Sequence, residues 1–432
     1  MSRTTHLIRM LGAGLVCVAL ATTSACSSKS AATNNSAPAS ATSSPLSSAA
    51  GAAGSAGSSA GPGSSAAPGS SAAPGSSAAP GSGGATSAGS AALALAHQGV
   101  TGPLPSAAVK PKSGVNYWVV SCGQRVSTCS STTAGAVEAA TKIGWQTHVC
   151  DGQLNPAGIS SCIRQAVAAK AAALQVIGTD CAPIKQALTE ANAAGIKTIG
   201  GGFDCSETGG DRVFSGFIKY QVKFSNHQWW AQIGKLQADW LIGATNGQAK
   251  VLSVKFTDEA WGDDIQNAFI AELKTCAGCS IVKTQELSNG DLADGSLRTK
   301  FSTALLQATT ANAINVPIDG WFSAGLAQAV TSSGRAATLK VIGSIGEVPN
   351  MEYIRTGAGE NASAAFSGNN SGWAGVDVAV RLLDGQTAPA DGFPEGVSIR
   401  VVDQTANLPA SGSPYQPPVD YRAAYLKLWG VS

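Results

Sequence analysis

Eight cysteines beyond residue 30 are the residues whose type and spacing most clearly suggest chemistry. The closest pair, Cys276-Ala-Gly-Cys279, could be half of a zinc site, a redox dithiol or a loop disulfide. A zinc site needs a second pair of ligands. A thioredoxin-like motif opens a helix after a strand, whereas this motif follows a predicted helix and precedes a strand. The sequence therefore favours a local disulfide.

The other six cysteines also have neighbours within bonding reach in the predicted elements. An even number of cysteines in an exported chain indicates disulfides, and each neighbouring pair flanks a turn or follows adjacent predicted strands. Many pairings are possible, but topology favours neighbours. We predict the pairs Cys122–Cys129, Cys150–Cys162, Cys181–Cys205 and Cys276–Cys279.

Residues suited to catalysis are scarce. The chain has four histidines, two of which (His6 and His97) fall in the N-terminal segments described below. The sequence contains no nucleophile elbow, phosphate-binding loop or zinc-protease motif. Asp263-Asp264 opens a predicted helix, where acidic side chains complement the helix dipole. We expect no catalytic residue, no metal and no cofactor, so the protein is predicted not to be an enzyme.

The first 26 residues have the features of a bacterial export signal. Two arginines precede an apolar run over 10–21, which is too short to span a bilayer. Residues 23–26 (Thr-Ser-Ala-Cys) resemble a lipobox, although Thr23 stands where leucine is usual. The alternative is an ordinary signal peptide with the cysteine incidental. We predict a lipoprotein signal peptide over 1–26, lipidation of Cys26 and anchoring to the extracytoplasmic face of the cell membrane.

A segment dominated by Ser, Ala, Gly and Pro follows the signal peptide. It includes a six-residue repeat that starts at Pro62, and we predict a disordered tether over 27–113. Residues 1–113 hold five bases and no acid, so 23 bases and 26 acids remain. The rest of the chain therefore has a charge of about −3, although the total is +2. This distribution excludes a broad basic face, and we expect no nucleic-acid partner.

Residues 114–432 alternate between strand and helix patterns. The buried strand pattern over 117–121 precedes a helix pattern over 132–143, and similar pairs recur, including a strand predicted over 318–322. Successive β–α–β steps imply parallel strands with right-handed crossovers. The predicted fold is α/β, with two doubly wound parallel-sheet lobes. Ligands of such sheets bind beyond the carboxyl ends of the strands.

Three local motifs resemble type I periplasmic binding proteins. Asp151-Gly-Gln-Leu-Asn-Pro, Ala191-Asn-Ala-Ala-Gly-Ile-Lys-Thr-Ile and the helix end Arg381-Leu-Leu-Asp-Gly-Gln are similar to segments of the ribose-type sugar-binding proteins of ABC importers. The resemblance covers roughly 114–430. It implies two lobes joined by a three-strand hinge that closes on a ligand. Lobe one would be about 114–222 and 368–395, and lobe two about 223–367 and 396–432.

The fold also implies a cleft between the lobes, lined by residues that follow the strands. Aromatic side chains in three of these turns are typical of sugar sites, where rings stack on C–H faces. We assign Trp229 and Trp230 to packing, although one of the two could still reach the cleft. The predicted ligand-binding residues are Gln124, Arg125, Asp180, Phe203, Asp204, Trp261, Asp263, Trp321, Phe322, Ser323, Glu347, Phe366, Ser367 and Asn369.

Three positions depart from the ribose-type pattern. Gly202-Phe203 stands where that pattern has Asp-Arg, Trp321 to Ser323 where it has Asn-Asp, and Ile345 where it has Asp. Apolar groups thus replace three groups that bind hydroxyls. An ordinary aldopentose or hexose is therefore disfavoured, and a less polar, larger or aromatic-bearing ligand is compatible with the sequence.

The leading hypothesis is a monomeric, lipid-anchored solute-binding component of an ABC importer, which presents a sugar-like molecule to the ABC permease. The alternative is a ligand sensor that presents a small molecule to a membrane receptor. A third hypothesis, a secreted hydrolase, requires a nucleophile hydrogen-bonded to a base in a concave site. Neighbouring genes for a permease and an ATPase, or for a histidine kinase, would separate the first two.

Overall fold

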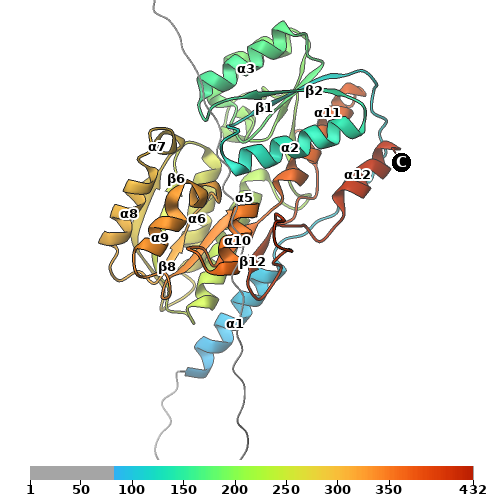
Figure 1. Cartoon of the computed structure of the whole chain (residues 1–432). Coiled ribbons are helices and arrows are strands. Elements are labelled where there is room, and N and C mark those ends of the chain that lie inside the picture. Colours follow the sequence, from blue (N-terminus) through green and yellow to red (C-terminus); the bar gives the residue numbers. More distant parts are fainter. Residues whose placement is uncertain (1–81, 432) are drawn as a thin grey trace, which may run out of the picture. The chain divides into compact units, whose positions relative to one another are not determined.

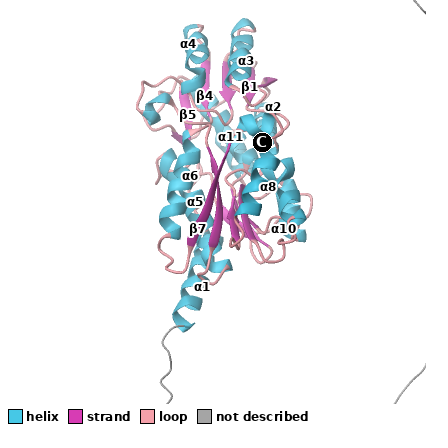
Figure 2. Cartoon of the chain, turned by 90° about the vertical axis from the view of Figure 1, so that its left-hand side faces the viewer, coloured by secondary structure: helices cyan, strands magenta, loops and turns pink. Residues whose placement is uncertain are grey.

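The computed structural model describes residues 82–431, so the predicted signal peptide, Cys26 and most of the predicted tether lie outside the described residues. The described part contains two six-stranded sheets, each flanked by helices, which form the two predicted lobes (Figures 1 and 2). No helix of this part is long and apolar enough to cross a membrane. The α/β prediction with two parallel-sheet lobes is confirmed.

Lobe one contains a sheet with the strand order β11-β5-β4-β3-β1-β2, in which all neighbours are parallel. Helices cover both faces, so a central strand such as β3 is buried along its whole length. The strands are β1 (Asn116–Ser121), β2 (Gln146–Asp151), β3 (Ala173–Val176), β4 (Lys197–Gly200), β5 (Gly216–Lys219) and β11 (Phe393–Pro394). The helices are α2 (Ser127–Lys142), α3 (Pro156–Ala168), η1 (Ala182–Ile184), α4 (Lys185–Ala193), η2 (Cys205–Thr208), α11 (Gly368–Leu383) and α12 (Tyr421–Trp429).

Lobe two contains a sheet with the order β12-β10-β9-β8-β6-β7, in which only β12 is antiparallel to its neighbour. The strands are β6 (Lys250–Phe256), β7 (Ser280–Leu287), β8 (Ala313–Asn315), β9 (Lys340–Ile345), β10 (Ala362–Ala365) and β12 (Arg400–Asp403). The helices are α1 (Ser82–Gln98), α5 (Asn226–Ala244), α6 (Ala260–Leu273), α7 (Asn289–Ala293), α8 (Leu297–Gln307), η3 (Phe322–Leu326), α9 (Ala327–Ser332) and α10 (Val348–Thr356).

Local capping fixes where several helices begin, and thus where the strand-end loops stop. Ser225 and Gln228 form a capping box at the start of α5, and Asn155 accepts the Gly158 N–H at the start of α3, whose first residue is proline. The side chain of Ser367 accepts the Asn370 N–H at the start of α11. These caps set short turns between the carboxyl end of a strand and the next helix.

Five segments connect the two lobes, in place of the three that were predicted. The predicted hinge is present as residues 220–225, 366–367 and 395–399, which join β5 to α5, β10 to α11, and β11 to β12. Two further crossings, 99–115 and 404–420, connect α1 to β1 and β12 to α12.

Helix α1 corrects the expectation that the tether extends to residue 113. The helix packs on α5 and β12, and Ala96 on it is fully buried. A Cβ on Gly243 of α5 would lie 2.8 Å from the Gly89 carbonyl oxygen, so the two helices meet at small residues. In α1, the Ser, Ala and Gly composition that indicated disorder instead allows this close packing.

Two other expectations need correction. Helix α12 belongs to lobe one, because the Trp429 ring stacks on Trp373 of α11 at 5.5 Å and its Nε1–H donates to Asp377. In the described part of the chain, the strand predicted over 318–322 is absent. The observed strand, β8, ends just before it, at Asn315. Residues 318–321, which are buried and include Asp319, instead connect β8 to η3.

The four predicted disulfides are present in the structure: Cys122–Cys129, Cys150–Cys162, Cys181–Cys205 and Cys276–Cys279. The first three lie in lobe one, in or beside the loops that follow β1, β2 and β3. They therefore brace the edge of the sheet that faces lobe two.

The disulfides should differ in their effect on stability. The bond Cys181–Cys205 spans 24 residues and Cys276–Cys279 spans three. Loop-closure entropy then predicts stabilisations of about 3.5 and about 1.6 kcal/mol. Replacing the first pair by serine should lower the urea midpoint of unfolding about twice as much as replacing the second. A mature chain carrying Cys26→Ser should show no free thiol when denatured, and four or more thiols would contradict these pairings.

Candidate functional site

A cavity lies between the two lobes, and both lobes contribute to its wall. Its volume is about 90 Å³, which is below the roughly 300–1,000 Å³ usual for ligand pockets. The wall is formed mainly at the carboxyl ends of the strands, where ligands of doubly wound sheets bind. The structure thus has a small, partly open cavity between the lobes, where the sequence predicted a cleft.

Aromatic rings form the wall on the side of lobe two and the hinge. Trp230 of α5 stacks on Trp261 of α6 with ring centres 4.7 Å apart, and the Phe366 ring lies edge-on to Trp230 with ring centres 5.8 Å apart. Phe256 connects Trp261 to Trp321, at 4.7 and 5.7 Å. Because these rings pack on one another, they form a wall that exists before any ligand enters.

Aliphatic side chains and a disulfide form the wall on the side of lobe one. Val126 and the pair Cys122–Cys129 come from the loop after β1 and the start of α2, and Ile177 directly follows β3. Ile218 lies in β5. Polar groups in this wall are few, and they belong to Thr128, Thr132, Gln175 and Ser371.

The structure brings three of the predicted ligand-binding residues to the cavity, the aromatic residues Trp261, Trp321 and Phe366. Trp230 also reaches it, in keeping with the expectation that one of the two adjacent tryptophans would. Trp229 is fully buried and donates its Nε1–H to Val397 in the third hinge crossing.

Asp180, one of the predicted residues, contacts the other lobe. Its carboxylate accepts the Ala260 N–H at 2.9 Å, and its own backbone N–H donates to Glu259 Oε2 at 2.9 Å. Burial and the charge of Asp180 raise the pKa of Glu259 to about 9, and burial also raises the pKa of Asp180. The two acids therefore lie at a contact between the lobes in which one of them holds a proton.

Two further contacts cross between the lobes near the cavity. Ser131 Oγ of α2 donates to Glu347 at 2.7 Å, and burial raises the pKa of Glu347 to about 8. His227, at the start of α5, lies with Nε2 2.9 Å from the Glu207 carbonyl oxygen and Nδ1 2.7 Å from Asp264. Burial lowers the pKa of His227, but these two hydrogen bonds outweigh burial and raise it.

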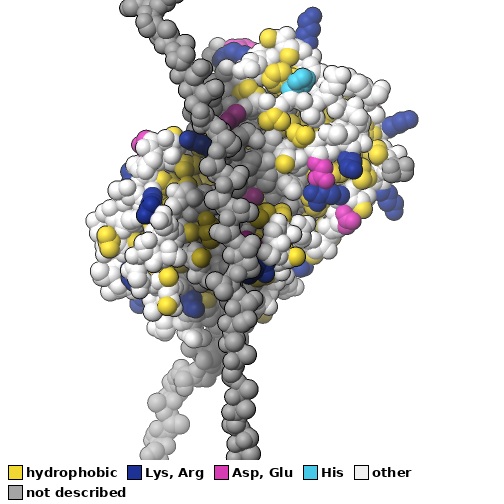
Figure 3. Space-filling view, in the orientation of Figure 1, with side chains coloured by type: hydrophobic (Ala, Val, Ile, Leu, Met, Phe, Trp, Pro, Cys, Tyr) yellow, Lys and Arg dark blue, Asp and Glu magenta, His cyan; other side chains and the backbone are white. Residues whose placement is uncertain are grey.

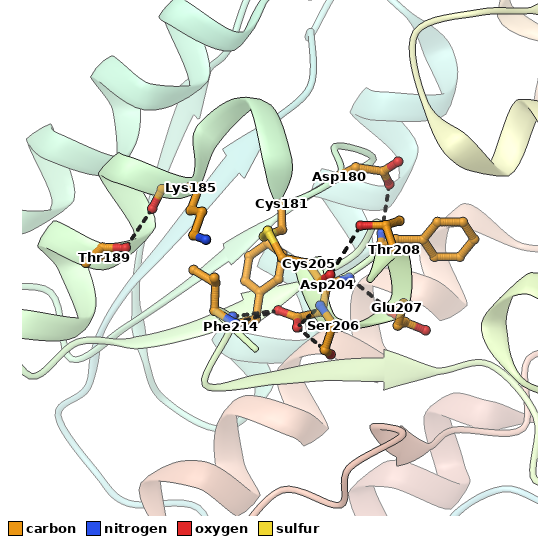
Figure 4. Close-up of a disulfide and its surroundings, with 12 residues drawn as sticks. Asp180, Cys181, Lys185, Thr189, Asp204, Cys205, Ser206, Glu207, Thr208 and Phe214 are labelled. Atoms are coloured by element: carbon orange, nitrogen blue, oxygen red, sulfur yellow. Dashed lines mark hydrogen bonds between the residues drawn. A yellow bond between two sulfur atoms is a disulfide. The ribbon is translucent and has the colours of Figure 1, made fainter. Parts of the chain in front are cut away.

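Asp204 and Phe203 stabilise the loop after β4 (Figure 4). The Asp204 carboxylate accepts backbone N–H groups of Ser206 and Phe214, and the neighbouring Cys205 is bonded to Cys181 in the loop after β3. The Phe203 ring lies 4.1 Å from the ring of His227. Neither residue lines the cavity, because the hydrogen bonds of Asp204 and the burial of Phe203 hold them within the loop.

The other predicted site residues also lie away from the cavity wall. Arg125 and Ser323 are exposed, and Phe322 is buried in lobe two. Three have groups engaged elsewhere: Gln124 donates to Ser121 and Thr133, Asp263 pairs with Lys255, and Ser367 caps α11. The backbone of Asn369 packs against Gly135, and its buried Oδ1 has no hydrogen-bond partner among the described residues.

Sequence reasoning missed most of the aliphatic wall. Residues such as Val126, Ile177 and Ile345 look like core positions in a pattern of hydrophobicity, and only their place at strand ends distinguishes them. Tyr220, which starts the first hinge crossing, could have been found from the expected hinge position.

No group of three or more His, Cys, Asp or Glu side chains among residues 82–431 is arranged to hold a metal ion. The face seen in Figure 3 carries scattered Lys and Arg side chains and no continuous basic patch.

A family model of the periplasmic binding protein domain matches residues 115–387, which is more than half of the chain. The chain belongs to the periplasmic binding protein family. No curated protein matches its sequence. The resemblance to type I periplasmic binding proteins seen in the sequence is thereby confirmed. Helix α1 lies before the residues that the family model matches.

Solved structures of sugar-binding proteins share the fold of this periplasmic binding protein. The 5-methylthioribose transporter solute binding protein of Thermotoga lettingae, in complex with 5-methylthioribose, has a TM-score of 0.58 at 18% identity, over 74% of this chain and 94% of that one. An ABC transporter solute binding protein of Agrobacterium vitis, bound with alpha-D-tagatopyranose, gives 0.56 at 20%, over 67% and 94%. One from Actinobacillus succinogenes with bound D-allose gives 0.56 at 20%, over 68% and 98%.

The contacts between the lobes should weaken as the pH rises. Glu259 keeps its proton up to about pH 9 in this structure, but would return to its ordinary pKa if the lobes separated. Its contribution to the closed form is therefore full below its ordinary pKa and is lost as the pH rises through about 9. The contributions of Glu347 and His227 to the closed form should also decrease as the pH rises, since their pKa values are raised as well.

Small-angle scattering of the ligand-free protein between about pH 5 and about pH 9 tests this prediction. The radius of gyration should increase with pH, and Glu259→Gln, which keeps an uncharged hydrogen-bonding group, should reduce the increase. Asp263→Asn is the matched control, because Asp263 pairs with Lys255 at the surface. A wild-type radius that does not change with pH would contradict the prediction.

Proposed function

We propose that this protein is a lipid-anchored, extracytoplasmic solute-binding protein that takes a sugar-like molecule into the cleft between its lobes and presents it to an ABC permease. The observation that carries the proposal is the cavity at the carboxyl ends of both sheets, walled by residues of both lobes. A site shared by two hinged lobes can be entered when they separate and is enclosed when they meet. Such a site suits transient capture and release of a solute.

Closure supports recognition by a permease because ligand binding then changes the separation of the two lobes. A ligand in the cavity touches Val126 and Ile177 of lobe one and Trp261 of lobe two at once, and it loses half of these contacts when the lobes separate. It therefore stabilises the closed form by its differential affinity for the two forms. A permease that binds the closed form more tightly then selects the loaded protein.

The relatives support a sugar-like ligand and an importer. The solved structures named above are transporter solute-binding proteins, and their ligands are 5-methylthioribose, tagatopyranose and D-allose. The aromatic wall of the present cavity agrees with this ligand class, because aromatic rings stack on the C–H faces of sugar rings.

Ligand binding should raise the thermal stability of the mature chain carrying Cys26→Ser. At a ligand concentration of 100 times Kd the stabilisation is about 2.7 kcal/mol, which a thermal-shift screen of neutral sugars and sugar derivatives would detect. Thr128→Phe should remove the shift by filling the cavity, whereas Thr189→Phe, on the exposed face of α4, should not. A broad sugar screen without any shift would count against a sugar-like ligand.

The lipid anchor has its own test. In cells that export the full chain, Cys26→Ser should move the protein from the membrane fraction to the surrounding fluid, because the substituted side chain cannot form a thioether with lipid. Ser27→Ala is the control and should leave the protein in the membrane fraction. Equal distribution of wild type and Cys26→Ser would show that Cys26 is not the anchor.

A further inference from the structure

The wall of the cavity carries no charge. Among the described residues, those that line it include no Asp, Glu, Lys, Arg or His. The acids at nearby strand ends, Asp180, Glu259 and Glu347, are used in contacts between the lobes. A charged ligand group enclosed by this wall would lose its hydration without gaining a counter-charge, at a cost of several kcal/mol. The enclosed part of the ligand is therefore uncharged.

Apolar side chains outnumber the polar ones in the wall, which belong to Thr128, Thr132, Gln175, Tyr220, Asn289 and Ser371. Val126, Ile177 and Ile318 face a ligand from one lobe or the other with aliphatic carbon, and the stacked rings of Trp230 and Trp261 add aromatic carbon. A free aldose would place several hydroxyls against these groups, and each one left without a partner costs about 1–3 kcal/mol. An alkyl or aryl group instead gains about 25 cal/mol for each Å² of apolar surface that it buries.

Ile345 at the end of β9 is held in an unfavourable backbone conformation. Its φ is +95°, in a region that β-branched residues rarely adopt. Such strain costs about 1–3 kcal/mol and persists where the side chain serves a purpose. Glycine would fit this backbone with less strain, yet the chain places a large aliphatic group on the cavity wall. This position adds a second reason for an apolar ligand surface.

Three buried donors on the wall, Trp230 Nε1, Gln175 Nε2 and the Thr128 hydroxyl, have no partner among the described residues. Trp230 and Gln175 are only 7% and 1% exposed. The amide oxygen of Gln175 already accepts the Tyr117 hydroxyl at 2.8 Å, which leaves its NH₂ group available. All three donors line the cavity, so a ligand that brings acceptor oxygens would satisfy them.

From these features together we infer that the ligand is an uncharged sugar derivative bearing an alkyl or aryl substituent, whose acceptor oxygens meet Trp230 and Gln175 and whose substituent lies against Ile345 and the aliphatic wall. This inference rests on the proposed function and narrows its ligand class. Free aldoses and charged sugars are poor ligands of the same cavity, because they lack the apolar group or carry a charge that the wall cannot match.

Isothermal titration calorimetry with matched ligands tests the inference on the mature chain carrying Cys26→Ser. The panel contains common aldoses, the methyl and phenyl glycosides of each, and the 6-phosphates of the hexoses. We expect at least one phenyl or methyl glycoside to bind at least about tenfold more tightly than its parent sugar, and no phosphate to bind.

Variants of the wall then locate the contacts. Ile345→Gly fits the backbone and removes the alkyl group, so it should weaken glycoside binding about tenfold while leaving any binding of the parent sugar nearly unchanged. Trp230→Phe keeps a ring and removes the N–H, and should weaken binding of the same glycoside by a similar factor. Trp118→Phe is the matched control, because Trp118 Nε1 is also buried without a partner but lies outside the cavity wall.

The outcomes separate this inference from the proposed function. Tighter binding of a parent sugar or of a phosphate would overturn the inference and leave a sugar-binding protein. An absence of binding across the whole panel would overturn the sugar-like ligand of the proposed function and the inference with it. Equal effects of Trp230→Phe and Trp118→Phe would show that the indole N–H of Trp230 does not contact the ligand.

Discussion

The packing of Trp229 holds the hinge together, and the position of the cavity depends on it. Its ring stacks on Tyr220 of the first crossing at 4.0 Å and lies 5.1 Å from Phe366 of the second, while its Nε1–H donates to Val397 of the third. One fully buried side chain thus contacts all three hinge crossings. The neighbouring Trp230 faces the cavity, so the same turn of α5 holds the hinge together and walls the site.

The distribution of charge follows from the parallel sheets facing each other. Because the carboxyl ends of both sheets meet, acids in strand-end loops of one lobe lie opposite backbone N–H groups or hydroxyls of the other. Asp180 and Glu347 illustrate this, since the first accepts the Ala260 N–H and the second accepts the Ser131 hydroxyl. The acids thus form hydrogen bonds between the lobes, and aromatic rings and aliphatic groups line most of the enclosed surface. The closure that forms these hydrogen bonds between the lobes therefore also encloses an uncharged site.

The sequence predicts the architecture, the disulfides and the aromatic part of the wall for clear physical reasons. Alternating strand and helix patterns predict parallel lobes, and topology favours pairing of neighbouring cysteines among the many possible connectivities. It does not predict α1, because the composition of that helix resembles a tether and its stability comes from docking at Gly243. It misassigns Asp180 and Asp204, since a strand-end acid can bind a ligand, a facing lobe or its own loop. Only coordinates distinguish these three uses.

The two additional crossings change how such a fold can open. In a three-crossing hinge the lobes are tied only beside Trp229, whereas here residues 99–115 and 404–420 also pass between the lobes. These segments end in α1, which docks on lobe two, and in α12, whose Trp429 stacks on Trp373 of lobe one. Any separation of the lobes therefore has to be accommodated by these two segments as well as by the three hinge crossings.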